Sequence, residues 1–449
     1  MNKEKVMGIL NCNTTKIILI VIIAIIGIII IRNKEIKKYE RIIDEKSPII
    51  INQENKYGYI NAAGKILIKP QYNSATRFYG NYAIVGEDDT YKIIDKKGKV
   101  KFENNNISKL LYISDYNVWL IDNVLYDSNL KRLSKKDLIV SYERNGIFKW
   151  KDKDNSISGL INYKGKTVFS YKYNDGESSL NIKSIKKDNK INSENTYCLI
   201  SIDNKKYSLI NCYNGKAIYK LSDDVITNSI DTIYEIRNSD KEFKERVLIF
   251  NGKKIYQTKD EDSNILNSNT YYTIKEKENE KYILKFTGKT VSEKPEDDST
   301  LSEIEKYLGY TKFTCDEGFG VKKGTDVKIK CEYDRVKFFD IVTSRYLKSK
   351  GKYYVLARKD KKYYLVNLKN GKTVDTFNTD NISTYSISMF ISYNDLDSQE
   401  KIVYSLKNGK KLSFDLDSKV TLYENYFTVE NDNIEYYNYS MKKVYTIKK

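Results

Sequence analysis

A short hairpin pattern recurs along this chain and constrains its fold more than any other feature. The first copy spans Asn55–Phe78. It has a strand-like run at Tyr57–Asn61, a turn with Gly64-Lys65, and a second strand-like run at Ile66–Lys69 that ends at Pro70. Alternating large residues on both sides of a glycine turn are typical of a β-hairpin.

The turn glycines mark the register of the repeat. Several follow one another at intervals of roughly 36 residues, within the range of repeat architectures. Weaker copies without glycine are expected at Val124–Leu133 and Ile434–Val444. A single hairpin cannot bury its apolar face, so neighbouring copies must stack. We assign a structural role in the turns to Gly64, Gly98, Gly165, Gly215, Gly252, Gly288, Gly324, Gly371 and Gly409.

This recurrence predicts an all-β repeat domain. Tyr, with 40 residues, and also Ile, Val and Thr are frequent, which favours strands over helices. Units of roughly three or four short strands fit a β-propeller-like arrangement, and an open β-hairpin solenoid is the alternative. The array divides into a first group at 49–294 and a second at 310–449. Between them, a capping box at Thr300 and Glu303 predicts a helical connector over 295–309.

The N-terminal region predicts a membrane anchor. After a polar tail at 1–16, the segment Ile17–Ile31 contains no polar side chain. A helix over this segment rises about 22 Å, short of the roughly 30 Å bilayer core, and the stems of Lys16 and Arg32 extend it by snorkelling. No small-residue cleavage site follows, so an uncleaved signal-anchor transmembrane helix is favoured over a cleaved signal peptide. Residues 32–48 are expected to form a charged stalk.

The orientation of this anchor has two interpretations. Lysines and arginines are denser after the apolar segment than before it, so the positive-inside rule would place the large domain in the cytoplasm. A single short N-terminal anchor, however, usually exports the chain that follows it. We predict a single-pass protein of the cell membrane whose bulk is extracellular, with a cytosol-facing domain as the alternative.

The composition limits the chemistry that the chain can perform. It has a formal charge of +18 and no His, which excludes a Ser-His-Asp or Cys-His nucleophile and His-ligated zinc. The charge favours polyanionic partners such as anionic lipid headgroups, wall polymers or nucleic acid. A solvated lysine-rich surface is the competing explanation, because no arginine-rich cluster focuses the charge.

Two short patterns resemble ligand sites without meeting their requirements. The run Gly159–Thr167 has one residue too many between its glycines for a P-loop. Asp152, Asp154 and Ser156 alternate as in a calcium loop, but Ile157 stands where that loop needs Gly. We therefore predict no metal site, no cofactor site and no catalytic residue.

Four cysteines lie on two of the predicted hairpins. Cys198 and Cys212 flank one turn, and Cys315 and Cys331 bracket another repeat. Outside the cell, a cross-strand disulfide within each pair is expected. Buried free thiols are the alternative, expected for a cytosolic domain. A metal site of four cysteines is disfavoured, because no Cys-x-x-Cys pair occurs.

The segment Asn55–Phe78 resembles the bacterial WG-repeat family. The unit of that family reads Trp-Gly-Tyr-Ile-Asp, a turn, Gly-Lys, an apolar pair, then Pro-x-Tyr-Asp. The present chain has Tyr57-Gly58-Tyr59-Ile60-Asn61, then Gly64-Lys65, Pro70 and Tyr72-Asn73. Further copies are identified at Gly318–Phe339 and Gly159–Asn174. The resemblance implies a repeat module for binding or scaffolding, with no catalytic residues to transfer.

Together these features predict a membrane-anchored, non-enzymatic β-repeat protein. Its domain would act as a binding or scaffold module at the cell surface and recognise a protein or an anionic envelope polymer. One alternative is a glycan-acting enzyme with a carboxylate pair in the centre of a propeller. Another is a cytosol-facing protein that binds a polyanion, with nucleic acid disfavoured as that partner. The oligomeric state stays open.

Overall fold

The computed structural model describes residues 42–448 except 89, 105–109, 155, 174–178, 188–194, 231, 251–252, 269–270, 277–278, 285–287, 293–307 and 386. Within these ranges the chain forms small antiparallel sheets and one short helix, so the predicted all-β repeat domain is confirmed. The strands of each sheet are consecutive in the sequence. We name the sheets A to K in chain order.

The first half of the chain forms sheets A to F. Sheet A contains β1 (Ile49–Gln53), β2 (Lys56–Ile60) and β3 (Ile66–Tyr72), and sheet B contains β4 (Ser74–Ala75), β5 (Tyr82–Glu87), β6 (Thr90–Asp95) and β7 (Val100–Asn104). Sheet C contains β8 (Leu110–Ile113), β9 (Val118–Ile121) and β10 (Val124–Asp127), and sheet D contains β11 (Leu138–Arg144), β12 (Ile147–Asp152), β13 (Ile157–Asn162) and β14 (Thr167–Lys172). Sheet E contains β15 (Leu180–Lys187), β16 (Thr196–Ile202), β17 (Lys206–Asn211) and β18 (Lys216–Ser222), and sheet F contains β19 (Val225–Ile230), β20 (Ile233–Arg237), β21 (Phe243–Phe250) and β22 (Lys253–Thr258).

The second half forms sheets G to K. Sheet G contains β23 (Asn264–Asn267), β24 (Tyr271–Glu276), β25 (Asn279–Leu284) and β26 (Thr290–Val291), and sheet H contains β27 (Thr311–Cys315), β28 (Gly318–Lys323) and β29 (Asp326–Tyr333). Sheet I contains β30 (Arg335–Phe338), β31 (Tyr354–Lys359), β32 (Lys362–Asn367) and β33 (Thr373–Phe377), with helix α3 (Ile341–Ser349) between its first two strands. Sheet J contains β34 (Ile382–Ser383), β35 (Phe390–Asn394), β36 (Lys401–Ser405) and β37 (Lys411–Phe414), and sheet K contains β38 (Lys419–Leu422), β39 (Phe427–Glu430), β40 (Asn433–Tyr437) and β41 (Lys443–Lys448).

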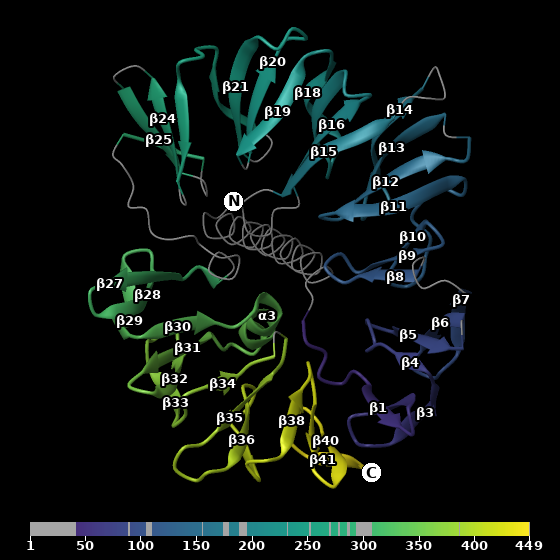
Figure 1. Cartoon of the computed structure of the whole chain (residues 1–449), viewed down its shortest axis with the longest axis vertical. Helices are drawn as coiled ribbons and strands as arrows, with labels where there is room; N and C mark the ends of the chain where they lie inside the picture. Colours follow the sequence, from purple (N-terminus) through teal and green to yellow (C-terminus); the bar gives the residue numbers. More distant parts are fainter. Residues whose placement is uncertain are drawn as a thin grey trace, which may run out of the picture.

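The sheets follow one another around a common centre, and the last sheet lies beside the first (Figure 1). Neighbouring sheets bury apolar side chains against each other, as stacked repeats must. Tyr59 of sheet A, for example, packs with Val85 of sheet B, and Phe148 of sheet D packs with Val118 of sheet C. The core is therefore a series of clusters between neighbouring sheets, and a single one of them joins sheets I, J and K.

The junction between sheets K and A joins the two ends of the array. Ile49 and Ile51 of β1 pack with Tyr426 and Tyr436 of sheet K in one buried cluster. The Nδ2 atom of Asn438 also donates a hydrogen bond of 2.7 Å to the carbonyl oxygen of Ala62. These contacts link residues that are far apart in the sequence.

The junction between sheets G and H differs from the others. Each of the other described junctions has a buried hydrophobic cluster, but within the described residues no such cluster joins sheet G to sheet H. The segment between them includes 293–307, which lies outside the described residues, as does most of the predicted connector at 295–309. The described residues thus do not form a closed propeller.

The described glycines of the predicted set lie in turns, and the hydrogen bonds of the first turn explain the sequence pattern. In the first turn the Gly64 nitrogen donates to the Asn61 carbonyl oxygen and the Asn61 nitrogen donates to the Lys65 carbonyl oxygen, both at 2.9 Å. Gly64 has a φ of 87°, which glycine adopts without steric cost. The Asn61 side chain accepts hydrogen bonds from the nitrogens of Ala63 and Lys65.

Most of the described glycine turns also contact the preceding sheet, which the sequence did not reveal; Gly324 and Gly409 do not. A Cβ atom on Gly64 would collide with the carbonyl oxygen of Val444, at the start of β41. The equivalent turn glycines Gly98, Gly165, Gly215 and Gly371 face the same part of their own preceding sheets, at Ile68, Leu133, Val168 and Lys328 respectively. Each of these contacts is made with residues just after the corresponding turn of the preceding sheet. The turns of successive sheets therefore lie at the same edge of the array.

The two weaker copies have the same turn without glycine. Leu130 and Met441 occupy the position of the turn glycine, with φ angles of 61° and 64°. Their nitrogens donate to the carbonyl oxygens of Asp127 and Asn438, as the glycine nitrogens do in the other copies. These turns carry the strain of a left-handed non-glycine residue, on the order of 1–2 kcal/mol each.

A second set of glycines lies inside the strands of the WG-like copies. A Cβ on Gly58 would lie 2.6 Å from the carbonyl oxygen of Ile68, and one on Gly320 would lie 2.7 Å from that of Ile329. At both positions the register of the sheet shifts: Tyr57 pairs with Tyr72 while Tyr59 pairs with Ile68. The glycine of the repeat motif thus allows a bulged strand to approach closely.

Several features of the prediction differ from the structure or lie outside it. The sequence analysis missed helix α3, whose first nitrogens at Val342 and Thr343 are capped by the Asp340 carboxylate. No helix of the described part is long and apolar enough to cross a membrane. The predicted anchor at 17–31 lies outside the described residues.

The residues that precede β1, Ile42–Pro48, dock against sheets I, J and K, and we name them the docking segment. Ile43 is buried in the cluster of these sheets. The carboxylate of Glu45 forms ion pairs with Lys350 at 2.7 Å and with Lys407 at 2.6 Å. Burial alone would raise the pKa of Glu45, but the two lysines outweigh it and hold the pKa below its usual value.

The turn contact can be tested with two equivalent glycines. Gly64→Ala should lower the free energy of unfolding by about 2–4 kcal/mol, because strain at positive φ adds to a collision with Val444. Gly324→Ala is the matched control: its φ is also positive, but no atom lies within 4 Å of the added Cβ. The control should cost only about 1 kcal/mol. Chemical denaturation in detergent measures both, and equal losses would contradict the contact.

The docking segment predicts a pH-dependent contribution to stability. Glu45→Gln should lower the free energy of unfolding by roughly 1–2 kcal/mol at neutral pH, because the two lysines lose their counter-charge. A carboxyl with a lowered folded-state pKa stabilises above its unfolded pKa, and this contribution is lost as pH falls through the folded pKa. The difference between the two proteins should therefore vanish between about pH 5 and pH 3. The exposed Glu54→Gln serves as a control, and a pH-independent difference would refute the prediction.

Candidate functional site

A hollow of about 810 Å³ lies on sheets I, J and K, within the range of ligand pockets. Its walls include β30, β34 and β38, which are the strands of their sheets nearest the centre in Figure 1. It extends towards the turn between β35 and β36, where Asn394 and Leu396 line it. Hydroxyl and amide side chains dominate the remaining lining: Thr379, Asn381, Ser383, Thr384, Ser392 and Thr421.

Two lysines bring positive charge to the hollow. The Nζ atom of Lys337 donates a hydrogen bond of 3.1 Å to the Thr384 hydroxyl. The Nζ atom of Lys401 donates one of 2.7 Å to the carbonyl oxygen of Ser418. Both groups are held at one end and keep further N–H donors for a ligand. Asp380 is the one carboxylate in the lining, so the hollow carries a net positive charge.

Two tyrosines in the hollow have different roles. Tyr393 is buried, and burial raises the pKa of its hydroxyl, as do the nearby carboxylates of Asp395 and Asp375. It therefore stays neutral and can donate a hydrogen bond. Tyr385 is 58% exposed, the highest exposure among the large apolar and aromatic side chains of the described part. An exposed aromatic ring beside amides and cations can stack on a sugar ring or another flat ligand face.

The sequence analysis did not identify this hollow. Its residues come from three sheets, and no local pattern joins Lys337, Tyr385 and Lys401. None of the predicted turn glycines lines the hollow. The described ones lie in turns, most of them against the preceding sheet, and Gly252 lies outside the described residues. The one local signal was Tyr385 itself, in a segment between two strands.

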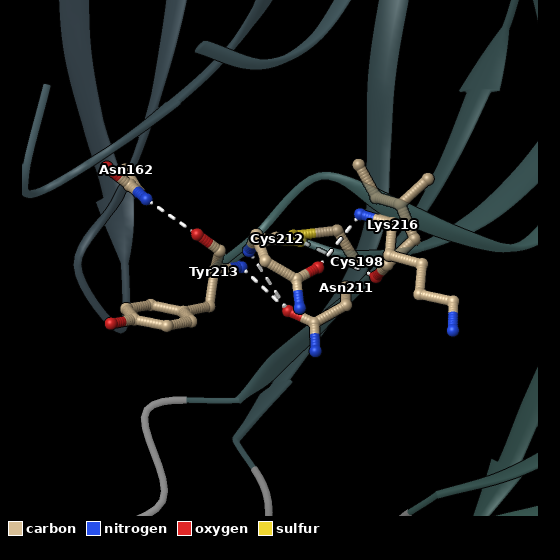
Figure 2. The surroundings of a disulfide bond; sticks show 8 residues. Asn162, Cys198, Asn211, Cys212, Tyr213 and Lys216 are labelled. Carbon is tan, nitrogen blue, oxygen red and sulfur yellow. Dashed lines mark hydrogen bonds between the residues drawn. A yellow bond between two sulfur atoms is a disulfide. The ribbon is translucent and has the colours of Figure 1, made fainter. Parts of the chain in front are cut away.

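The predicted cysteine pairs are joined by disulfide bonds in the structure. Cys198 and Cys212, with Cα atoms 5.8 Å apart, are completely buried in the cluster between sheets D and E. Figure 2 shows this bond beside the turn of sheet E, where the Asn162 amide of sheet D donates a 2.8 Å hydrogen bond to the Tyr213 carbonyl oxygen. Cys315 and Cys331 lie in sheet H at a Cα distance of 6.1 Å, and Cys315 is exposed.

Metal and acid–base chemistry have little support in the described part of the chain. No group of three or more His, Cys, Asp or Glu side chains there could hold a metal ion. The hollow has a single carboxylate, Asp380, whereas glycoside hydrolysis generally uses two. The arrangement at the hollow suits binding by hydrogen bonds, charge and stacking.

The difference in burial predicts the order in which the disulfides are reduced. Mild reductant on the folded protein should open Cys315–Cys331 first, because Cys315 is exposed, while Cys198–Cys212 should resist until the protein unfolds. Alkylation followed by mass spectrometry measures this order. Labelling of all four cysteines after denaturation without reductant would show free thiols instead.

Comparisons with known proteins add one local assignment. The model of a family described as "WG containing repeat" matches residues 57–91, which run from β2 into β6. No curated protein sequence matches the chain.

One similar solved structure is a eukaryotic initiation factor, at 11% identity and a TM-score of 0.31, over 90% of this chain and 96% of that chain. The WD40 domain of SCAP from fission yeast has 8% identity and a TM-score of 0.22, over 90% of this chain and 88% of that chain. The computationally designed Ika8 protein has 10% identity and a TM-score of 0.20, over 80% of this chain and 99% of that chain. These TM-scores are too low to carry an argument. The comparisons therefore support a WG-containing repeat, spanning parts of sheets A and B.

Proposed function

We propose that this protein is a membrane-anchored, non-enzymatic member of the bacterial WG-repeat proteins that binds an anionic envelope polymer at the cell surface. In this proposal the sheets act as the blades of a propeller-like array, and 17–31 holds the array at the membrane. The observation that carries the proposal is the hollow on sheets I to K, with two lysines, one carboxylate and an exposed tyrosine.

The lining favours a polymer over a protein as the ligand. Its hydroxyl and amide groups can replace the water bound to a polyhydroxylated chain, and Lys337 and Lys401 can bind its phosphate or carboxylate groups. Polar side chains outnumber the four aliphatic ones in the lining, Ile382, Leu396, Val420 and Leu422, whereas the centre of a protein–protein interface is generally apolar. A protein would fit if it presented the same polar and acidic chemistry.

Binding can be tested with polyglycerol phosphate as the probe and the full chain in detergent. Replacing both lysines, Lys337→Gln and Lys401→Gln, should weaken binding by at least about tenfold, because charge-assisted hydrogen bonds are lost. Tyr385→Ala should also weaken it through the loss of stacking. Isothermal titration calorimetry measures the affinities.

The control for general charge effects is the pair Lys205→Gln and Lys361→Gln, two exposed lysines outside the hollow. This pair should bind like the parent. Equal weakening in both double variants would show that the hollow is not the site. On intact cells, a membrane-impermeant maleimide should label Tyr385→Cys above the parent background, and protection until lysis would refute the surface location.

A further inference from the structure

The fold sorts charges that are mixed in the sequence onto two opposite edges of the array. In a four-stranded sheet with consecutive strands, the first-to-second and third-to-fourth turns lie at one edge, and the second-to-third turn lies at the other. Among the described third-to-fourth turns with glycine, Gly324 of sheet H is followed by Thr325, and all the others carry a lysine directly after the glycine, at Lys65, Lys99, Lys166, Lys216, Lys289, Lys372 and Lys410. We name this edge the lysine face.

The opposite edge is acidic. Its second-to-third turns contain Glu54, Asp88, Asp122, Asp203, Asp360 and Asp432. Sheets A and H have only three strands, but β2 and β28 correspond to third strands, because Gly58 and Gly320 have the same close contact with the next strand as Gly159 of β13. The few lysines at this acidic edge, such as Lys205, are interspersed with aspartates.

Contacts between sheets show that the lysine turns share one face. The Nζ atom of Lys166 donates a 2.8 Å hydrogen bond to the Asn214 carbonyl oxygen, from the turn of sheet D to that of sheet E. Asn438 likewise joins the turn of sheet K to Ala62 in the turn of sheet A. The lysine face therefore runs from sheet to sheet and across the junction between the ends of the array.

The docking segment joins the array at this same face. Glu45 pairs with Lys407, in the third-to-fourth turn of sheet J, and with Lys350, in the first-to-second connection of sheet I. The Ser47 carbonyl oxygen accepts a 3.0 Å hydrogen bond from Asn425, in the first-to-second connection of sheet K. The chain N-terminal to residue 42 thus starts from the lysine face.

We propose that the lysine face lies on the membrane surface and binds anionic lipid headgroups. This proposal depends on the proposed function, because it requires the membrane anchor at 17–31. Residues 32–41 can span at most about 35 Å, so the face from which they leave must stay close to the bilayer. Clustered lysines near a membrane are attracted to anionic lipids. The acidic edge, towards which the hollow extends, then points away from the membrane and leaves the hollow accessible.

The test uses the full chain in vesicles of neutral phosphatidylcholine, with or without about 30% phosphatidylglycerol, a composition rich enough in anionic lipid for lysines to sense. Ala63→Cys places a thiol on the lysine face and Ser239→Cys one on the acidic edge; both residues are exposed. We expect a soluble maleimide to label Ala63→Cys at least fivefold more slowly on the anionic vesicles than on the neutral ones. Labelling of Ser239→Cys should not change, and high salt should abolish the difference.

Two sets of charge reversals provide the control. Lys65→Glu, Lys99→Glu, Lys372→Glu and Lys410→Glu together should abolish the protection of Ala63→Cys. The matched set on the acidic edge, Lys153→Glu, Lys205→Glu, Lys241→Glu and Lys361→Glu, should leave it intact. Equal labelling of Ala63→Cys on both vesicle types, or equal effects of the two sets, would overturn the proposal. Failure of the chain to float with neutral vesicles would instead refute the anchor, while protection on anionic vesicles would still support the lysine face.

Discussion

The close approach of most glycine turns to the preceding sheet is the contact on which the arrangement depends. At Gly64 the backbone lies so near the Val444 carbonyl group that a side chain is excluded. A similar backbone approach at Gly165, Gly215 and Gly371 sets neighbouring sheets at similar positions relative to one another. Apolar burial at each junction supplies stability, because each large side chain contributes about 1.5–3 kcal/mol, but it is less directional. The turn contacts give the array its common edge.

Local chemistry explains which parts of this arrangement the sequence could predict. A glycine followed by lysine between two strand-like runs is a complete signal for a turn, and the turns at Gly64 and Gly165 have the expected hydrogen bonds. The residue that a turn contacts in the preceding sheet cannot be predicted from the local sequence. Gly64, for example, contacts Val444, which lies at the other end of the chain. Helix α3 was missed because it is short and inserted between two strands of one sheet, although Asp340 is a typical N-cap residue.

The distribution of charge in space cannot be read from the composition alone. In the sequence, acids and lysines alternate within short windows, which suggests a uniformly solvated surface. Successive turns of an antiparallel sheet lie at opposite edges, so an alternation along the chain becomes a separation in space. Asp88 and Lys99, for example, are close in sequence but end at opposite edges of sheet B. The strand order, which the sequence leaves open, turns the alternation of charges along the chain into a separation of charges between the two edges.

The region around the hollow differs from the corresponding region of sheet B in how its aromatic side chains pack. Sheets B and J both begin with a strand of two residues, β4 and β34. After β4, the chain fills the space with its own aromatic rings: Phe78 packs on Tyr59 at 4.9 Å, and Tyr79 stacks on Tyr112 at 4.4 Å. After β34, the aromatic residue Tyr385 is exposed instead. The exposed ring of Tyr385 beside the polar lining is the feature that makes sheet J the proposed ligand site.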